Sequence, residues 1–422
     1  MKTLILLLLS ITTGFAFGQN NSFNCIIEGE VLNRPESKEL LLIKEGEDLR
    51  ISAVSIPIVN GKFNHKFSSS EIESYQLCFK DEFEKGAWRP ILFFAEPSVI
   101  KFRLYPMDEY FSNEISGGKY NDAYNEFKNT EKRLFDFASI ERESKKLQEE
   151  NNYLSEAGQK LYGQISAASE QHVIDSLNQI IQEYRRDKKF LSKEAMDNEA
   201  KARQLYIDML NWQTDQVKNN INLISYRALL MLLNISQTSY SEPIPISLHE
   251  LIAVYENEYK KRFPRHPYTV KTELLVNAIT TVKKGGKFID FTAPDFEGNT
   301  VKFSEQLKGK IVLLNLWASW CGPCRRHGKE IIPVYEKYKS KGFEVIGVAR
   351  ERDKSAGLKA AAMDEYPWLN LLELNDENKI WQKYGIGNSG GGMFLINSEG
   401  IILAVSPTAE ELENILKSET GL

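Results

Sequence analysis

An apolar run that ends in two closely spaced cysteines constrains this chain more than any other feature. Residues 310–317 are almost continuously apolar, and Cys321 and Cys324 follow with Gly322 and Pro323 between them. A structural disulfide gains most from closing a long loop, and a bridge between these cysteines closes almost nothing. The pair therefore predicts either redox chemistry or metal binding.

Metal binding requires more ligands than the sequence places near the pair. A structural zinc site takes four ligands, usually with a second pair of cysteines or histidines. The 422 residues include four cysteines and five scattered histidines, and no second Cys-x-x-Cys occurs. We therefore expect no metal and no cofactor, and we interpret the pair as a redox centre.

The expected elements around the pair indicate how it works. Cys321 stands where a strand ends and a helix, expected to run through Tyr338, begins. Unpaired N–H groups and the positive end of the helix dipole favour a thiolate there, and the thiolate is the nucleophile of disulfide exchange. Pro323 suits the first helical turn, and Gly322 leaves the approach to Cys321 open. Cys324 then lies within reach to resolve a mixed disulfide.

The N-terminus predicts export. Residues 1–18 have the layout of a cleavable signal peptide, with Lys2, an apolar run and small residues before Gln19. An uncleaved membrane anchor is the alternative, although the apolar run is short for a span. We expect the periplasm or cell envelope, an oxidising compartment. Cys25 and Cys78 either pair there or are small buried apolar residues, and the second interpretation is favoured.

Short alternating segments predict a β-rich domain over residues 19–118. Asn60-Gly61 predicts a hairpin over residues 56–67, and Pro57 indicates an edge strand. We expect an antiparallel β-sandwich, with further strands at 25–31, 40–44, 75–80, 91–95 and 99–104.

The chain then changes character twice. Residues 119–284 contain long stretches with helical spacing of apolar residues, which predicts a helical region with solvated charged faces. Residues 285–422 alternate between strand and helix patterns, which predicts an α/β domain with a central mixed sheet. Its expected strands are 310–317, 343–349, 369–374, 393–397 and 401–405.

Residues 287–422 resemble the thioredoxin fold, in the exported thioredoxin-like branch typified by TlpA and ResA. Residues 25–128 are similar to the β-rich domain that often precedes such modules in Bacteroidetes. The resemblance implies thiol–disulfide exchange in the periplasm, with Cys321 attacking and Cys324 resolving. Its main carriers are A-P-D-F (293–296), L-K-G-K-I-V-L-L-N-L-W-A-S-W-C-G-P-C-R (307–325), G-F-E-V-I-G-V-A (342–349), Y-G-I (384–386) and F-L-I-N-S-E-G-I-I (394–402).

Three positions depart from the pattern that the resemblance implies. Asn315 replaces a buried aspartate that transfers protons to the resolving cysteine, and an amide cannot act as a general base. His327 replaces a glutamate; it either tunes or shuttles protons or, the favoured interpretation, is a half-exposed helix residue. Gly391 lies nearest to the place of a cis-proline, so we expect a trans or irregular loop and a more open, less ordered groove. Because Trp320 and residues 321–324 are intact, we expect an active site with altered substrate selection.

Three functions stay open. The leading one is an exported thiol–disulfide oxidoreductase, expected to reduce rather than oxidise, because Gly-Pro between the cysteines matches the reducing member of the fold, whose potential is about −270 mV. It would act on disulfide-containing proteins and depend on a membrane electron donor. The second is a substrate-binding or scaffold protein with a redox-sensing or inactive thioredoxin module. A peroxidase is disfavoured, because Ala318 stands where peroxiredoxins carry a threonine. The net charge of −5 gives no reason to expect a nucleic-acid partner.

Overall fold

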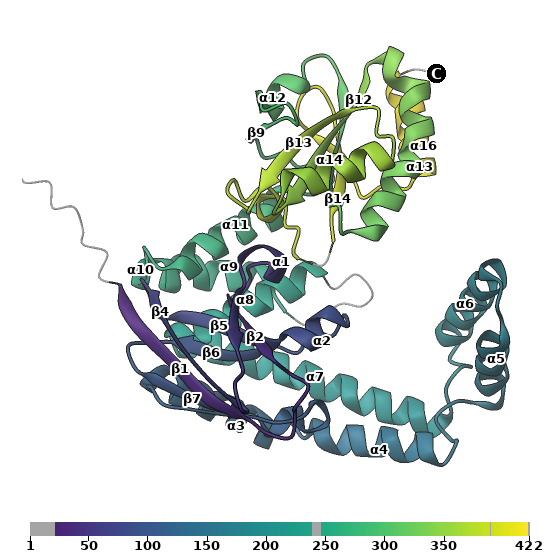
Figure 1. Cartoon of the computed structure of the whole chain (residues 1–422). Helices are drawn as coiled ribbons and strands as arrows, with labels where there is room; N and C mark the ends of the chain where they lie inside the picture. The colour runs from purple at the N-terminus through teal and green to yellow at the C-terminus, as the bar shows by residue number, and fades with distance from the viewer. Residues whose placement is uncertain (1–21, 239–245, 389, 421–422) are drawn as a thin grey trace, which may run out of the picture.

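The computed structural model of the chain describes residues 22–238, 246–388 and 390–420 (Figure 1). The predicted signal peptide, residues 1–18, lies outside this range. Within it, no helix is both long and apolar enough to cross a bilayer. A β-rich part and a set of helices lie together, and an α/β part lies against them (Figure 1).

Two four-stranded sheets form the β-rich part. Alternate side chains of both sheets, such as Ile27, Leu42, Phe93 and Phe102, fill one core, so the predicted sandwich is confirmed. One pair departs from the antiparallel pattern, because β1 and β7 run parallel. In order across each sheet, the strands are β4 (Lys62–Ser69), β1 (Phe23–Val31), β7 (Val99–Leu104) and β8 (Glu114–Ser116), and β3 (Val54–Pro57), β2 (Glu39–Lys44), β5 (Glu73–Phe79) and β6 (Ile91–Ala95).

The predicted hairpin over residues 56–67 is wrong in its pairing. Asn60 and Gly61 do form a tight turn, with φ angles of 52° and 70°. Beyond the turn, however, β3 pairs with β2 and β4 pairs with β1, so the turn carries the chain from one sheet to the other. Alternation predicts a strand but not its partner. The edge position indicated by Pro57 is confirmed, since β3 is an edge strand.

The middle of the chain is helical, as predicted. Side chains of Asp136, Ser155 and Ser192 accept hydrogen bonds from backbone N–H groups of the first turns that follow them, which fixes where three of these helices begin. The helices here are α3 (Lys119–Leu134), α4 (Phe137–Glu149), α5 (Glu156–Ala167), α6 (Gln171–Arg186), α7 (Lys193–Asn219), α8 (Leu223–Thr238), α9 (Leu248–Val254), α10 (Lys260–Arg262) and α11 (Pro267–Thr281); the short α1 (Leu49–Ser52) and α2 (Lys80–Glu84) lie within the β-rich part.

The helices and the second sheet share a core. Phe94 of β6 is fully buried among apolar residues of α7, α8 and α9. The Asn121 side chain of α3 accepts from the Phe94 amide and donates to its carbonyl, both at 2.8 Å. The α5–α6 pair lies away from this core, at the far ends of α4 and α7 (Figure 1).

The C-terminal part has a five-stranded mixed sheet with helices on both faces, which confirms the predicted thioredoxin fold. Its strands, in spatial order, are β13 (Leu369–Leu374), β12 (Phe343–Glu351), β11 (Ile311–Trp317), β14 (Gly392–Ile396) and β15 (Ile402–Val405). Its remaining elements are β9 (Thr292–Pro294), β10 (Thr300–Lys302), α12 (Phe303–Gln306), α13 (Gly322–Tyr338), α14 (Lys354–Met363), α15 (Ile380–Lys383) and α16 (Ala409–Thr420).

The central strand β11 is buried on both sides. Leu314 and Leu316 belong to the core on one face, whereas Leu313 belongs to the core under α13 and α16 on the other. This explains the continuous apolar run in the sequence. The residues that follow the helical region are hydrogen-bonded to the sheet. The Gly285 amide donates to the Ile402 carbonyl, and the Ile402 amide donates to the Gly286 carbonyl, both at 2.8 Å.

Candidate active site

β11 and α13 present the two cysteines at one edge of the sheet. Cys321 is the N-cap of α13, and its Sγ accepts a hydrogen bond from the Cys324 amide at 3.3 Å. The two sulfurs are joined in a disulfide, with their Cα atoms 5.3 Å apart. Pro323 occupies the first turn, where its missing N–H leaves no intrahelical bond unmade. The pair thus lies at a helix N-terminus, where N–H groups and the dipole favour negative charge on sulfur.

One side of the disulfide is open. Cys321 itself is only 4% exposed, and Cys324 is half-buried. Gly322 and Pro323 are exposed, and a Cβ added at Gly322 would meet no atom within 4 Å. A substrate disulfide therefore has space on the Gly322 side of the pair.

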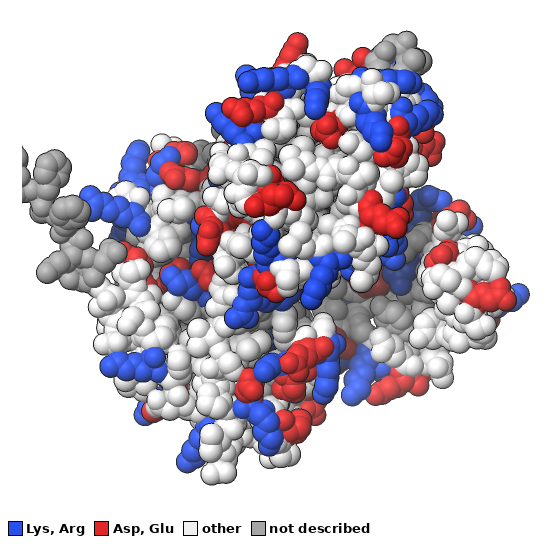
Figure 2. Space-filling view, turned by 45° about the horizontal axis from the view of Figure 1, so that its top comes forward, with Lys and Arg blue, Asp and Glu red and all other residues white. Residues whose placement is uncertain are grey.

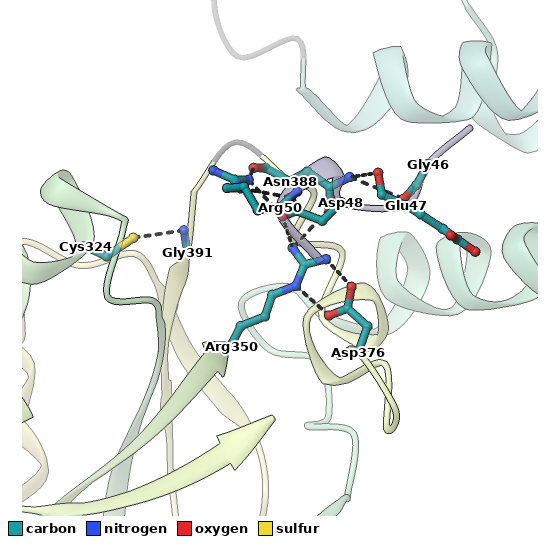
Figure 3. Close-up of polar contacts among 9 residues, drawn as sticks. All are labelled: Gly46, Glu47, Asp48, Arg50, Cys324, Arg350, Asp376, Asn388 and Gly391. Atoms are coloured by element: carbon teal, nitrogen blue, oxygen red, sulfur yellow. Dashed lines mark hydrogen bonds and ion pairs between the residues drawn. The ribbon is translucent and has the colours of Figure 1, made fainter. Parts of the chain in front are cut away.

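Gly391 lies directly against the disulfide. Its amide donates to the Cys324 Sγ at 3.1 Å (Figure 3). A Cβ at this position would overlap the carbonyl oxygen of Leu316, so the backbone comes closer here than any other residue permits. All described peptide bonds are trans, as expected for the bonds around Gly391. At Gly391 the loop packs tightly, rather than leaving the groove open as expected.

Asn315 is buried on β11, between Gly347 of β12 and Met393 of β14. Its Nδ2 has no hydrogen-bond partner among the described residues. His327 lies on the exposed side of α13, as the favoured interpretation expected. The structure thus brings Trp320, Gly322, Pro323 and Gly391 to the cysteines and places His327 on the surface.

Cys25 and Cys78 are free and buried in the β-rich part. Burial raises the pKa of the Cys25 thiol to about 11 and that of Cys78 to about 12. Both residues are therefore poor nucleophiles at neutral pH.

The start of α13 is anchored by charges that the sequence analysis missed. Arg325, next to Cys324, donates two hydrogen bonds to Asp364, at 2.6 and 2.9 Å. Burial alone would raise the pKa of Asp364, but the hydrogen bonds from Arg325 and Lys329 outweigh it and hold that pKa below its usual value. The ionised carboxylate fixes the helical turn that carries Cys324.

Glu351 is a second group that the sequence analysis missed. It is 2% exposed at the end of β12, and its carboxylate accepts from the amide and, at 2.9 Å, from the hydroxyl of Ser319, two residues before Cys321. Burial raises its pKa, against the effect of these hydrogen bonds. The sequence did contain a signal for this residue. The carboxyl ends of parallel strands meet at one edge of a sheet, and Glu351 ends the strand beside β11.

A Glu351→Gln variant is expected to be more stable than the wild type at neutral pH, by a margin that grows as the pH rises above about 4.5, the ordinary glutamate value. Because the folded-state pKa is raised, the folded protein holds a proton that the unfolded chain releases, so stability falls with pH through this window. Glutamine keeps an acceptor for Ser319 and does not titrate. Thermal melts from pH 4 to 8 measure the margin; Glu399→Gln, at an exposed site, is the control. A constant margin would contradict the assignment.

A thioredoxin fold with a Cys-x-x-Cys disulfide at the start of its first long helix defines a thiol–disulfide oxidoreductase of the thioredoxin-like class. Residues 285–405 match the AhpC/TSA family. Over 134 residues, 31% of this chain and 75% of the relative, the chain is 32% identical to thiol-disulfide oxidoreductase ResA of Bacillus thuringiensis (strain Al Hakam). Over 144 residues it is 36% identical to ResA of Halalkalibacterium halodurans, covering 79% of that protein and 32% of this chain. The chain therefore belongs, through its C-terminal third, to the ResA family of thiol-disulfide oxidoreductases.

A solved structure is similar to about a third of this chain. It is the thioredoxin domain of a thiol-disulfide oxidoreductase from Bacteroides vulgatus, at 27% identity and a TM-score of 0.31. It covers 33% of this chain and 99% of that one.

Proposed function

We propose that this protein is a periplasmic thiol–disulfide reductase that uses Cys321 and Cys324 on disulfide-containing proteins. The observation that carries the proposal is the Cys321–Cys324 disulfide at the N-terminus of α13, in a chain whose relatives are thiol-disulfide oxidoreductases. The exported location rests on the signal-like residues 1–18 and is part of the proposal.

In the reduced protein, the Cys321 thiolate attacks one sulfur of the substrate disulfide, and the other substrate sulfur leaves as a thiolate. Cys324 then attacks the Cys321 sulfur and releases the second substrate thiolate, which leaves the pair in the disulfide form seen here. Two electrons pass to the substrate, so a donor, which we place in the membrane, has to return two. The Gly391 amide, 3.1 Å from the Cys324 Sγ, is placed to stabilise negative charge on the resolving sulfur.

The other residues around the cysteines shape the site and hold its backbone in place. Trp320 precedes the nucleophile and packs beside Trp381, with ring centroids 6.0 Å apart. Gly322 and Pro323 keep the approach open and the helix start intact. Asn315 keeps the aspartate position uncharged, and we assign no step to the exposed His327. Glu351 holds Ser319, and with it the turn before Cys321.

The charge distribution favours a protein substrate over a nucleic acid. On the face drawn in Figure 2, lysines and arginines are interspersed with aspartates and glutamates instead of forming an extended basic surface. The net charge of the chain is −5. Nucleic-acid binding relies on concentrated positive charge, so this surface offers little to a phosphate backbone.

The direction of transfer is tested by equilibrating the full chain with mixtures of reduced and oxidised glutathione and counting free thiols by alkylation. We expect the Cys321/Cys324 pair to stay oxidised until the mixture is strongly reducing, with a midpoint near the thioredoxin value of about −270 mV. A midpoint near −120 mV, typical of strong periplasmic oxidants, would overturn the reductase assignment.

A further inference from the structure

A segment of the β-rich part reaches the active site of the C-terminal part. Residues 46–50, which run from the turn after β2 into the first residues of α1, lie beside the loop that leads to Gly391 (Figure 3). The guanidinium carbon of Arg50 lies 3.3 Å from the ring centroid of Trp320, the residue next to Cys321. Such a contact between a cation and an aromatic face is attractive, so it fixes the Trp320 ring from outside its own domain.

The same segment holds Asn388, three residues before Gly391. The Asn388 side chain donates to the carbonyls of Gly46 and Glu47, at 3.3 and 3.0 Å. Its Oδ1 accepts from Arg350 at 3.0 Å, and its backbone carbonyl accepts from Arg50. Both the side chain and the main chain of Asn388 are therefore tied down, as Figure 3 shows.

Buried charged side chains join the segment to the α/β part. Asp48 is 2% exposed and Arg350 is fully buried, and their side chains meet at 3.4 Å across the interface. Arg350 also pairs with Asp376, while Asp48 accepts from Arg50 at 2.8 Å. Two arginines and two aspartates balance, so the cluster orders the interface without creating a charged site for a substrate.

The helical part contacts Glu45, the residue immediately before the segment. Glu45 accepts two hydrogen bonds from Arg227 of α8, at 2.8 and 2.7 Å. Its backbone carbonyl accepts from Lys271 of α11 at 2.9 Å. Contacts with the helices therefore hold the residue before the segment, and contacts with Asn388 hold the segment itself. The segment is restrained at both places.

We propose that residues 46–50 are part of the active site, with Arg50 and Asn388 as positioning residues for the disulfide exchange. The glycine-rich loop lacks the fixed φ that a proline gives, and the contacts from the β-rich part supply that restraint, so that the Gly391 amide stays on the Cys324 sulfur. Arg50 and Trp320 then form one wall of the substrate approach. Because the Gly322 side is open, the segment is a wall and not a lid.

This proposal rests on the proposed function and is tested on the full chain with Arg50→Ala and Asn388→Ala. We expect kcat/KM to fall about tenfold with both insulin and oxidised glutathione, mainly through kcat, since small misplacements at a reacting centre are costly. The glutathione equilibrium of the pair is also expected to shift, an effect that a purely structural contact would not have. Arg103→Ala, an exposed arginine of β7 paired with Glu30, is the matched control and should behave as the wild type.

Two results would overturn the proposal. One is kcat/KM and a glutathione equilibrium within twofold of the wild type in both variants. The other is a rise in rate, which would make the segment a cover. Arg50→Lys keeps the charge without the planar stack, so its intermediate loss tests the same contact if Arg50→Ala does not fold. A wild-type protein without any reductase activity would instead overturn the proposed function, and this inference with it.

Discussion

Replacing Cys321 by serine is expected to lower kcat/KM for insulin reduction by at least about 10³-fold, because removing the nucleophile removes the covalent step itself. A serine hydroxyl does not ionise near neutral pH and forms no mixed disulfide. We do not expect Cys324 to take over, because its sulfur accepts a hydrogen bond from the Gly391 amide. Insulin turbidity and oxidised-glutathione assays measure the loss.

Cys324→Ser is expected to behave differently from Cys321→Ser. Cys321 still attacks, but the mixed disulfide is not resolved, so a covalent complex with substrate accumulates and is released by reductant. Cys78→Ala is the matched control, because it removes a buried thiol far along the chain and should leave activity unchanged. If Cys321→Ser reduces insulin at the wild-type rate, the binding or scaffold function is the better account of the chain.

The sequence predicted the elements around the cysteines well, for a local reason. The apolar run at 310–317 is buried on both faces, so its strand was visible without knowledge of its neighbours. The start of α13 was visible because Pro323 and the glycine before it mark a first helical turn. Strand pairing was harder to predict from the sequence. The turn at Asn60-Gly61 was predicted correctly, but the strands on its two sides belong to different sheets.

The contacts at the domain interface could not be predicted, because they join residues far apart in the sequence that look ordinary by themselves. Arg50 and Asp48 resemble any surface pair, and Asn388 resembles any loop residue. Only the fold brings them together and buries Arg350 completely. The missing proline at Gly391 therefore predicted a less ordered groove, whereas the loop is restrained by a segment about 340 residues away in the sequence.

Gly391→Ala is expected to impair both stability and activity. The added Cβ would overlap the Leu316 carbonyl, a backbone atom that moves only if β11 moves with it. Steric insertions of this kind cost typically about 1–3 kcal/mol in unfolding free energy. The displaced amide would also lose its hydrogen bond to the Cys324 Sγ, so we expect kcat to fall about tenfold or more. Gly387→Ala is the matched control, since a Cβ there meets no atom within 4 Å.

Gly391→Pro is the sharper variant, because it restores the residue that the thioredoxin fold usually carries. We expect it to be at least as damaging as alanine: proline has no N–H to donate to Cys324, and its ring adds to the overlap with Leu316. Chemical denaturation, insulin reduction and the glutathione equilibrium of the three variants separate stability from function. If proline raised activity while alanine lowered it, the loop would be a less active form of the usual proline-containing loop, and the glycine would not be required. If both lower it and Gly387→Ala does not, the glycine is required because the backbone, held by the β-rich part, approaches the disulfide more closely than a side chain allows.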